Sequence, residues 1–540
     1  MSTMRFLPAG VKRLLVEMPS LTAAQALFAS LARDPIEDIV EIVPAARTLL
    51  LTFQPGWDLP AVVKNLRARD LSAAPEDAGA HLELPVLYDG EDLDEVAQLT
   101  GLSRETVIER HASAEYTVAF TGFAPGFAYM SGGHPSLQVP RRQSPRTRIP
   151  AESVAIAGEF CGIYPRASPG GWQILGRTPV RMFDEDRDPP ILLKPGMRVR
   201  FRPLADEAAF ERAAAERCGS ASTRVGSSDD RDATSHLVVE ATPLPAVFQD
   251  LGRPGRTDQG IGRSGALDRE SFREANRLVG NAADSACLEI VAGGFAFRAE
   301  ERAVVALAGA VATLKITTAD GRSIVEPSGR PVALEAGDRV TLGVFTRGAR
   351  AYLAVRGGFV LERRFGSWST DTLAGIGPEP AVAGSVLRVG SVSNGPAVGD
   401  PASAPALPAA GETVTLDLVL GPRTDWFTPE AVKDFLARDW LVTPRSNRIG
   451  LRLSGGQGLV RTDPGAELPS EGTAYGAVQV PHDGQPVLFL ADHPLTGGYP
   501  VIGVVAEHHL DLAGQVPVGA FIRFRALHPF RPFDEEPALS

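Results

Sequence analysis

The chain has 540 residues, of which 44% are hydrophobic and 22% are charged, and its formal net charge at pH 7 is −11. That length exceeds a single hydrophobic core, so we expect several domains. The acidic balance argues against general binding to nucleic acid or to an anionic membrane. The three cysteines are widely spaced, which favours neither a disulfide framework nor a zinc site. No signal-peptide core opens the sequence, and we expect a cytoplasmic protein without a membrane partner.

The first half begins with a small α+β subdomain, residues 1–80. Apolar runs at 13–18 and 48–53 predict strands, and the spacing of Ala and Leu at 22–32 and 59–69 predicts helices. From 81 to 204 short strands alternate with Gly/Pro turns, interrupted by one helical insert over 92–111. A closing helix is predicted at 206–217. Residues 219–236 have almost no apolar content, so we expect 205–236 to form a helix and a flexible linker.

Short strands dominate the second half as well. Its first subdomain spans 237–393 and contains one clear helix, 267–280, which Asp268 caps and Gly280 terminates. A Pro/Ala-rich loop at 394–412 separates it from a second subdomain, 413–530. We therefore expect a mainly β protein with α+β additions, of barrel or sandwich architecture.

A glycine- and arginine-rich segment, residues 249–268, is the first candidate site. Its GIGRSG stretch at 260–265 fits G-x-G-x-x-G, but a polar loop rather than a buried strand precedes it, so a dinucleotide site is disfavoured. Arg253 and Arg263 could bind carboxylate or phosphate bidentately, and the glycines would let the backbone approach a ligand closely. A plain glycine-rich turn remains an equal alternative for the 260–265 stretch.

Three segments of the first half and one of the second carry further candidates. The loop at 121–132 offers Phe127 and Tyr129, the stripe at 140–150 offers arginines fixed by prolines, and Trp172 follows two glycines. Core packing and a rigid exposed connection explain the first two equally well. Asp492 and His493 end an apolar strand and could supply acid–base chemistry, although a histidine beside a carboxylate is more often structural.

These motifs carry a family resemblance over most of both halves. The first half, with GFAPGFAY (122–129), PRRQSPR (140–146) and PGGW (169–172), resembles the allophanate hydrolase subunit 1 family. The second half, with QDLGRPG (249–255), SGALD (264–268), NRLVGN (276–281), GSWST (366–370), VQVPHDGQP (478–486) and TGGYP (496–500), is similar to the subunit 2 family. Two positions depart from the family patterns: Glu152 replaces a usual glycine, and Trp368 replaces a usual arginine.

The resemblance implies two cyclophilin-like β-barrel halves joined by a flexible linker. It also implies a fused form of the B and C components of ATP-dependent 5-oxoprolinase, which opens 5-oxoproline to glutamate with a separate, LamB/YcsF-like A component. ATP with Mg²⁺ would then be used. The alternatives are a biotin-dependent carboxyltransferase of the urea carboxylase type and a non-catalytic module that binds a kinase. A homo-oligomer is also left open.

Opening an unstrained lactam needs cations for its carboxylate and for phosphates, and donors for the charge that develops on the amide. Laid over the family motifs, this requirement gives a hypothesis for the site across the two halves, with no residue assigned to a metal. Catalytic candidates are Gln479, Asp492, His493, Thr496 and Tyr499. Candidates for binding substrate or ATP are Phe127, Tyr129, Arg146, Gly171, Trp172, Arg253, Gly260, Gly262, Arg263, Ser264, Gly265, Asp268, Gly497 and Gly498.

Overall fold

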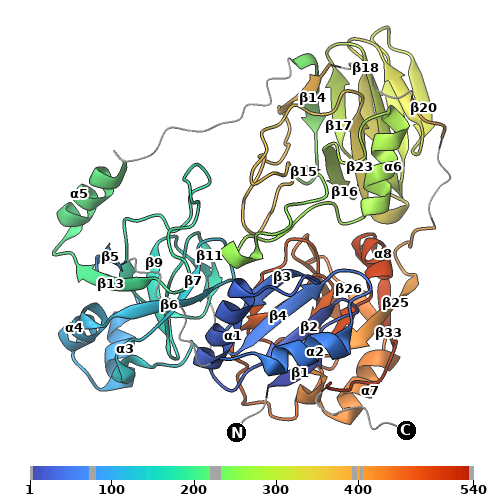
Figure 1. Cartoon of the computed structure of the whole chain (residues 1–540). Helices are drawn as coiled ribbons and strands as arrows, with labels where there is room; N and C mark the ends of the chain where they lie inside the picture. The colour runs from blue at the N-terminus through green and yellow to red at the C-terminus, as the bar shows by residue number, and fades with distance from the viewer. Residues whose placement is uncertain are drawn as a thin grey trace.

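The computed structural model describes residues 4–71, 81–142, 144, 146–218, 233–391, 398–401 and 406–533. Four bodies follow one another along the chain: an α/β unit, a first barrel, a two-sheet sandwich and a second barrel (Figure 1). Most of the predicted linker, 219–232, and part of the predicted loop at 394–412 lie outside the described residues. Among the described helices, none combines the length and the apolar character that crossing a bilayer requires.

The α/β unit is a four-stranded antiparallel sheet in the order β1-β2-β4-β3, with two helices on one face. Ser20 and Asp58 cap the helices by accepting hydrogen bonds from Ala23 N and Ala61 N. The predicted strands and helices of this unit are confirmed. Its elements are β1 (Arg5–Pro8), β2 (Arg13–Glu17), α1 (Leu21–Arg33), β3 (Ile39–Pro44), β4 (Thr48–Phe53) and α2 (Leu59–Ala68).

The first barrel is a seven-stranded sheet in the order β12-β9-β10-β7-β6-β13-β5. β5, the first of these strands in the sequence, pairs in parallel with β13, the last. An isolated bridge between Leu87 and Arg177 joins the β5 edge of the sheet to its β12 edge. Its elements are β5 (His81–Val86), α3 (Leu93–Thr100), α4 (Arg104–Ser113), β6 (Tyr116–Thr121), β7 (Ala128–Ser131), η1 (Pro135–Leu137), β8 (Arg146–Ile149), β9 (Ser153–Ala157), β10 (Phe160–Ile163), β11 (Ser168–Gly170), β12 (Gln173–Arg177), β13 (Arg198–Pro203) and α5 (Glu207–Cys218).

The single helical insert predicted over 92–111 is wrong in one respect. It forms two helices, α3 and α4, because Gly101 takes a left-handed conformation that ends α3 and Ser103 caps α4. The closing helix predicted at 206–217 is confirmed as α5.

The sandwich packs a six-stranded sheet, β20-β19-β22-β17-β14-β24, on a five-stranded sheet, β15-β16-β23-β18-β21. Helix α6 covers the outer face of the second sheet, capped by Asp268 and ended by Gly280 as predicted. The elements are β14 (Ala233–Ala241), β15 (Val247–Gln249), η2 (Thr257–Gln259), α6 (Arg269–Val279), β16 (Cys287–Val291), β17 (Ala296–Ala299), β18 (Ala303–Val311), β19 (Thr313–Thr317), β20 (Ser323–Pro327), β21 (Pro331–Leu334), β22 (Arg339–Leu342), β23 (Arg347–Val355) and β24 (Val386–Gly390).

The predicted linker extends too far at its carboxyl end. Residues 233–236 belong to β14, where they pair with β24, so the strand begins four residues before the predicted start at 237. Polar composition hid this start because alternate side chains of the strand face solvent.

The second barrel is closed, in the order β25-β32-β29-β30-β27-β26-β33, and its first and last strands again pair in parallel. The expected barrel in each half is therefore confirmed, and the second half adds the sandwich. Its elements are β25 (Thr413–Leu420), η3 (Thr424–Trp426), α7 (Pro429–Ala437), β26 (Trp440–Val442), β27 (Gly450–Ser454), β28 (Glu471–Gly472), β29 (Ala477–Gln479), β30 (Val487–Phe489), β31 (Thr496–Gly497), β32 (Val501–Val505), η4 (Glu507–His509), α8 (Leu510–Gly514) and β33 (Phe521–Ala526). The capped helix α7 was not predicted.

The N-terminal sheet is buried on both faces, which explains its unbroken apolar strands. Leu14 and Leu49 pack under α1 and α2, whereas Leu15 and Leu50 pack against the second barrel. We call this second contact the shared core; its barrel members are Ala474, Ala477, Val487, Phe489, Leu495, Val501 and Val504. At its edge the buried Arg423 donates to Glu471 at 3.0 Å and to Glu17 of β2 at 2.9 Å.

A buried ion cluster joins the sandwich to the second barrel. Arg448 donates to Asp492 at 2.9 Å, to Glu289 at 2.6 Å and to the carbonyl of Gly265 at 2.7 Å. Burial, and then the neighbouring charge of Asp492, raise the pKa of Asp371 to about 7. These subdomains therefore meet through charges as well as through apolar contacts.

We expect the two halves to stay together without a covalent link. If a specific protease site is placed within 219–232 and cleaved, the fragments should co-elute in size-exclusion chromatography, because the shared core and the Arg423–Glu17 pair hold them. The uncut protein with the same insertion is the control. Two separated peaks would contradict the expectation.

Replacing Asp371 by Asn should change the pH dependence of stability. The native carboxyl has a raised pKa, so the native state binds more protons than the unfolded state between pH 4 and 7, and the wild type loses stability as pH rises through that window. The free energy of unfolding of D371N minus that of the wild type should therefore be larger at pH 8 than at pH 5, by on the order of 1 kcal/mol or more. In other words, D371N becomes more stable relative to the wild type as the pH rises. Denaturant titration at both pH values measures it; equal differences at the two pH values would contradict the raised pKa.

Candidate functional site

A cavity of about 350 Å³ lies between the two barrels, and we call it the inter-barrel cavity. Both halves contribute to its lining. The first barrel supplies Phe123, Phe127, Tyr129, Arg141, Arg142, Tyr164, Pro169, Gly170, Gly171 and Trp172. The second supplies Arg461, Glu467, Leu468, Ser470, Gln479, His482, Pro494, Thr496, Gly497, Gly498 and Tyr499.

Aromatic rings form the wall on the first-barrel side. Phe127 meets Trp172 edge-on at 5.5 Å and Tyr129 edge-on at 5.0 Å. A side chain on Gly162 would approach both Phe127 and Trp172 to 3.0 Å, so glycine is needed behind this wall. The rings are therefore fixed by packing and present a rigid apolar surface to the cavity.

Polar groups of the second barrel face that wall. The buried hydroxyl oxygen of Thr496 has no hydrogen-bond partner among the described residues, and Gln479 uses its amide nitrogen on the carbonyl of Tyr499 at 3.2 Å. Arg461 lies over the ring of Tyr499 at 6.0 Å, and its guanidinium donates to the carbonyl of Val480. The cavity thus combines a flat apolar side, hydrogen-bonding groups and cations, which suits a small polar ring bearing a negative charge.

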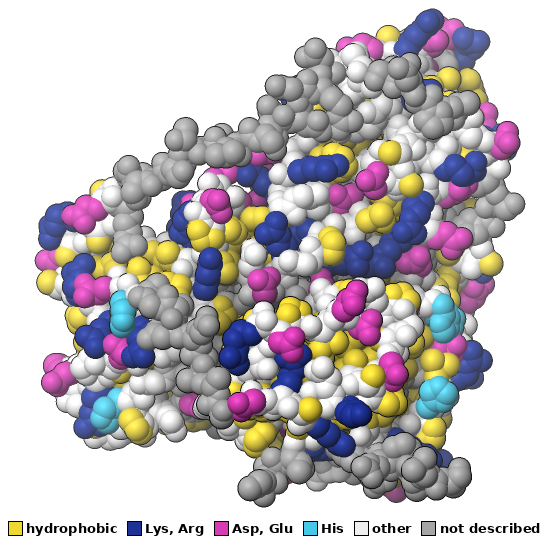
Figure 2. All heavy atoms as spheres, viewed as in Figure 1, with side chains coloured by type: hydrophobic (Ala, Val, Ile, Leu, Met, Phe, Trp, Pro, Cys, Tyr) yellow, Lys and Arg dark blue, Asp and Glu magenta, His cyan; other side chains and the backbone are white. Residues whose placement is uncertain are grey.

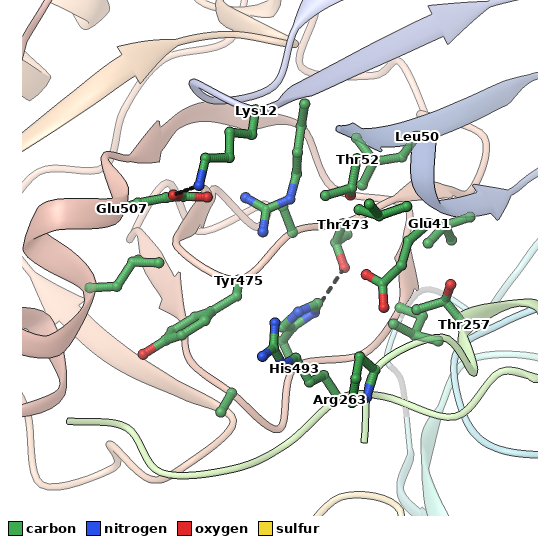
Figure 3. Close-up of a pocket in the computed structure, with 18 of the residues that line it drawn as sticks. Lys12, Glu41, Leu50, Thr52, Thr257, Arg263, Thr473, Tyr475, His493 and Glu507 are labelled. Carbon is green, nitrogen blue, oxygen red and sulfur yellow. Dashed lines mark hydrogen bonds and ion pairs between the residues drawn. The ribbon is translucent and has the colours of Figure 1, made fainter. Parts of the chain in front are cut away.

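A second and larger cavity, of about 730 Å³, lies between the α/β unit, the 254–273 segment and the second barrel (Figure 3). We call it the arginine cavity, because Arg13, Arg263, Arg269 and Arg273 line it with Lys12. Lys12 is paired with Glu507 at 2.5 Å.

The histidine predicted as an acid–base group belongs to this second cavity. His493 stacks on Phe489, and its Nδ1 lies 2.9 Å from the carbonyl oxygen of Pro494 and 3.4 Å from the hydroxyl of Thr473. Burial lowers the pKa of His493 to about 4, so the ring is neutral at pH 7. Asp492 points the other way, into the Arg448 cluster, so the structure does not assemble Asp492 and His493 into a pair.

One thin wall separates the two cavities. It consists of the β28–β31 ribbon with its flanking residues, and successive side chains alternate between the sides. His493 and Leu495 face the arginine cavity, whereas Pro494 and Thr496 face the inter-barrel cavity. A side chain on Gly122 of the first barrel would come within 2.5 Å of Thr496, and one on Gly472 within 2.6 Å of Leu50, so glycine allows both units to clamp the ribbon.

Several predicted site residues have structural partners instead. Arg253 is buried, donates to the carbonyl of Ser369, and lies near the charges of Asp371 and Asp250. Ser264 donates to Asp492 at 2.7 Å, and Asp268 accepts from Ser271 and Gln515. These side chains are thus already occupied within the protein.

Arg146 and the glycine-rich loop also make contacts within the protein. Arg146 is paired with Asp92 at 2.6 Å. Side chains on Gly252 or Gly265 would collide with the facing strand of the same loop, and Gly260 has a φ of +72°. Gly260 and Gly262 line neither of the two cavities.

Apart from Arg146, Gly260, Gly262 and Gly265, the predicted site residues fall into three sets. The inter-barrel cavity brings together Phe127, Tyr129, Gly171, Trp172, Gln479, Thr496, Gly497, Gly498 and Tyr499. The arginine cavity receives Arg263, Ser264 and His493, and the fold's interior holds Arg253, Asp268 and Asp492. From the 140–150 stripe, sequence reasoning chose Arg146 for the site, whereas Arg141 of the same stripe lines the first cavity. It missed Arg461 in the first cavity and Lys12, Arg13, Arg269 and Arg273 in the second. The only sequence signal for Arg13 was its position as a charged residue at the start of the apolar run 13–18.

The two departures from the family patterns have visible consequences. Glu152 has a φ of +61°, a backbone conformation that glycine adopts without strain, which explains the usual glycine. Trp368 is largely buried and stacks under the guanidinium of Arg363 at 3.8 Å, so it packs where an arginine would place a charge.

Among the described residues one group has metal-ligand spacing: Asp417, His508 and His509. It does not suit Mg²⁺. Arg525 donates to Asp417, and Nδ1 of His509 accepts the backbone amide of Asp417 at 2.8 Å. Mg²⁺ prefers oxygen ligands and is usually held with substrate phosphates, so this group offers it little.

Comparison with known proteins identifies both halves. Residues 4–193 match the family model described as carboxyltransferase domain, subdomain C and D, and residues 259–526 match carboxyltransferase domain, subdomain A and B. The B component of 5-oxoprolinase from Escherichia coli O157:H7 is 41% identical over 195 residues, which are 35% of this chain and 89% of that protein. The C component of 5-oxoprolinase from Escherichia coli K12 is 36% identical over 279 residues, which are 52% of this chain and 87% of that protein.

The arrangement of the whole chain is also found in a solved structure. The crystal structure of TTHA0988 superposes with a TM-score of 0.77 at 33% identity and covers 95% of this chain and 100% of that one. The order of the two halves and their packing are therefore shared. This chain belongs to the carboxyltransferase-domain family, with a half related to the B component of 5-oxoprolinase followed by a half related to its C component.

Proposed function

We propose that the chain is the fused B and C component of an ATP-dependent 5-oxoprolinase, which opens 5-oxoproline to glutamate together with a separate LamB/YcsF-like A component. The names of the relatives support a hydrolase-type enzyme of several subunits. The observation that carries the proposal is the inter-barrel cavity, because each half supplies one of its sides.

The cavity suits the chemistry of 5-oxoproline, a planar five-membered lactam with a carboxylate. Phe127 and Trp172 would hold the ring face, and the guanidinium of Arg141, which has no ion pair among the described residues, would bind the carboxylate. The free hydroxyl of Thr496 and the amide of Gln479 would orient the lactam amide. Fixed donors at that position stabilise charge that develops on the amide oxygen when the ring opens.

ATP would make the amide oxygen a leaving group by phosphorylating it. Of the two arginines predicted to hold phosphate, Arg253 and Arg263, only Arg263 lines a cavity, and that is the arginine cavity. Mg²⁺ would enter on the phosphates, since the Asp417 group does not suit it.

The first test is reconstitution. Purified chain mixed with the A component, ATP and Mg²⁺ should convert 5-oxoproline to glutamate with release of ADP and phosphate, measured by coupled ADP detection and amino-acid analysis. Either protein alone should give no glutamate. Absence of ATP consumption in the complete mixture would sink the proposal.

The second test concerns the inter-barrel cavity. R141Q should raise KM for 5-oxoproline about 10-fold, because a charge-assisted hydrogen bond is lost, and T496V should lower kcat/KM about 10-fold. R148Q is the matched control, because Arg148 lies on the same stripe, in β8, and does not line the cavity. A change in R148Q as large as in R141Q would mean that general charge, not this cavity, sets KM.

The alternative of a biotin-dependent carboxyltransferase is favoured by the descriptions of both family models. It predicts activity only with a biotinylated partner. Avidin added to the reconstituted mixture should leave 5-oxoprolinase activity unchanged, whereas avidin-sensitive carboxyl transfer would favour the alternative.

A further inference from the structure

The arginine cavity carries more positive charge than its carboxylates balance. Its lining holds five cationic side chains, those of Lys12, Arg13, Arg263, Arg269 and Arg273, against three carboxylates, those of Glu41, Glu507 and Asp511. His493 adds no charge, because burial keeps it neutral. An excess of two positive charges in a chain whose net charge is −11 is a local departure from the protein's overall balance.

The excess cannot be assigned to ion pairs within the fold. In the described part of the chain, none of the four guanidinium groups forms an ion pair; Lys12 alone is paired, with Glu507. Arg263 donates to the carbonyl of Leu251 at 3.4 Å, and Arg269 lies 5.9 Å from the ring of Tyr475. Desolvation, and then the neighbouring charge of Arg269, lower the pKa of Arg263.

These cations are brought together from separate elements, and the fold does not remove their repulsion. Arg13 opens β2, Arg263 lies in the loop before α6, and Arg269 and Arg273 lie one helical turn apart in α6. Glu507 and Glu41 offset part of the charge of Arg13, but Glu507 is paired with Lys12, and Glu41 accepts a hydrogen bond from the backbone amide of Gly255 at 3.1 Å. Partly buried like charges without partners destabilise a protein unless a ligand neutralises them.

The shape and the other surfaces of the cavity narrow the choice of ligand. A volume of about 730 Å³ is within the range of small-molecule sites. Val43, Leu50, Phe53 and Tyr475 add apolar surface to its lining. Arg263 and Arg273 are exposed, so these two cations are reachable from solvent. Figure 2 shows Lys and Arg side chains gathered where the sandwich meets the lower bodies.

We propose that the arginine cavity binds a polyphosphate anion, with Arg13, Arg263, Arg269 and Arg273 holding its phosphates. Guanidinium forks match phosphate oxygens bidentately, and a polyphosphate supplies the several negative charges that a single carboxylate lacks. The two sources of this chemistry are a nucleoside polyphosphate and an inorganic polyphosphate. The site stands on its own charges, and its occupation does not depend on whether the chain opens 5-oxoproline.

Titration calorimetry on the purified full chain, without the A component and without 5-oxoproline, tests the site. ATP, ADP, pyrophosphate and orthophosphate are the probes, each with and without Mg²⁺. We expect ATP or pyrophosphate to bind, and R13Q and R263Q each to weaken that binding by about 10- to 100-fold. If pyrophosphate binds and ATP does not, the ligand is an inorganic polyphosphate. If ATP binds and pyrophosphate does not, the ligand is a nucleotide.

R322Q is the matched control, because Arg322 is an exposed arginine in the sandwich, paired with Asp320 and remote from the cavity. Its affinities should equal those of the wild type. Without ligand, R13Q should melt no lower than the wild type, because the substitution removes a charge that burial disfavours. If R13Q fails to fold, R273Q replaces it. No polyphosphate binding at millimolar concentration, or equal binding by wild type, R13Q and R263Q, would overturn the assignment. Failure of glutamate formation would leave this result unchanged, so the two proposals fail separately.

Discussion

The contact on which the site architecture depends is the burial of the N-terminal sheet against the second barrel. Leu7, Leu15 and Leu50 pack on Ala477, Phe489 and Val504. Arg423 donates to Glu471 and also to Glu17, which lies 406 positions before it in the sequence. This contact brings β2, with Arg13, beside the barrel's ribbon and the loop before α6. Without it neither the arginine cavity nor the clamped wall between the cavities would exist.

The local structure was largely predictable because it depends on neighbouring residues. Asp268 and Gly280 mark the ends of α6, and the unbroken apolar run 48–53 marks a strand buried on both faces. Errors arose where one residue changes the path of the chain. Gly101 divides one predicted helix into two, and the polar start of β14 is recognisable only from its pairing with β24.

The candidate site was predictable only in part, for a physical reason. The motifs with Trp172 and with Thr496 were recognisable because the residues of each motif are close in sequence. The structure places both motifs at one cavity. An arginine that binds a ligand and one that pairs internally look alike in sequence: Arg253 and Arg146 have partners within the protein, whereas Arg141 and Arg13 lack ion pairs among the described residues. The partners that decide between these roles come from distant segments.

The shared core also has a consequence for how the chain is made. β4 ends at Phe53, whereas β32, the last strand of the core, ends at Val505. At a synthesis rate of ~5–20 residues per second, the apolar face formed by Leu7, Leu15 and Leu50 stays exposed for roughly 20 to 90 s before β32 has been synthesised. During that interval the nascent chain exposes an aggregation-prone apolar sheet, which is the kind of surface that nascent-chain chaperones bind. In relatives whose halves are separate polypeptides, the same face must instead be covered by assembly after release.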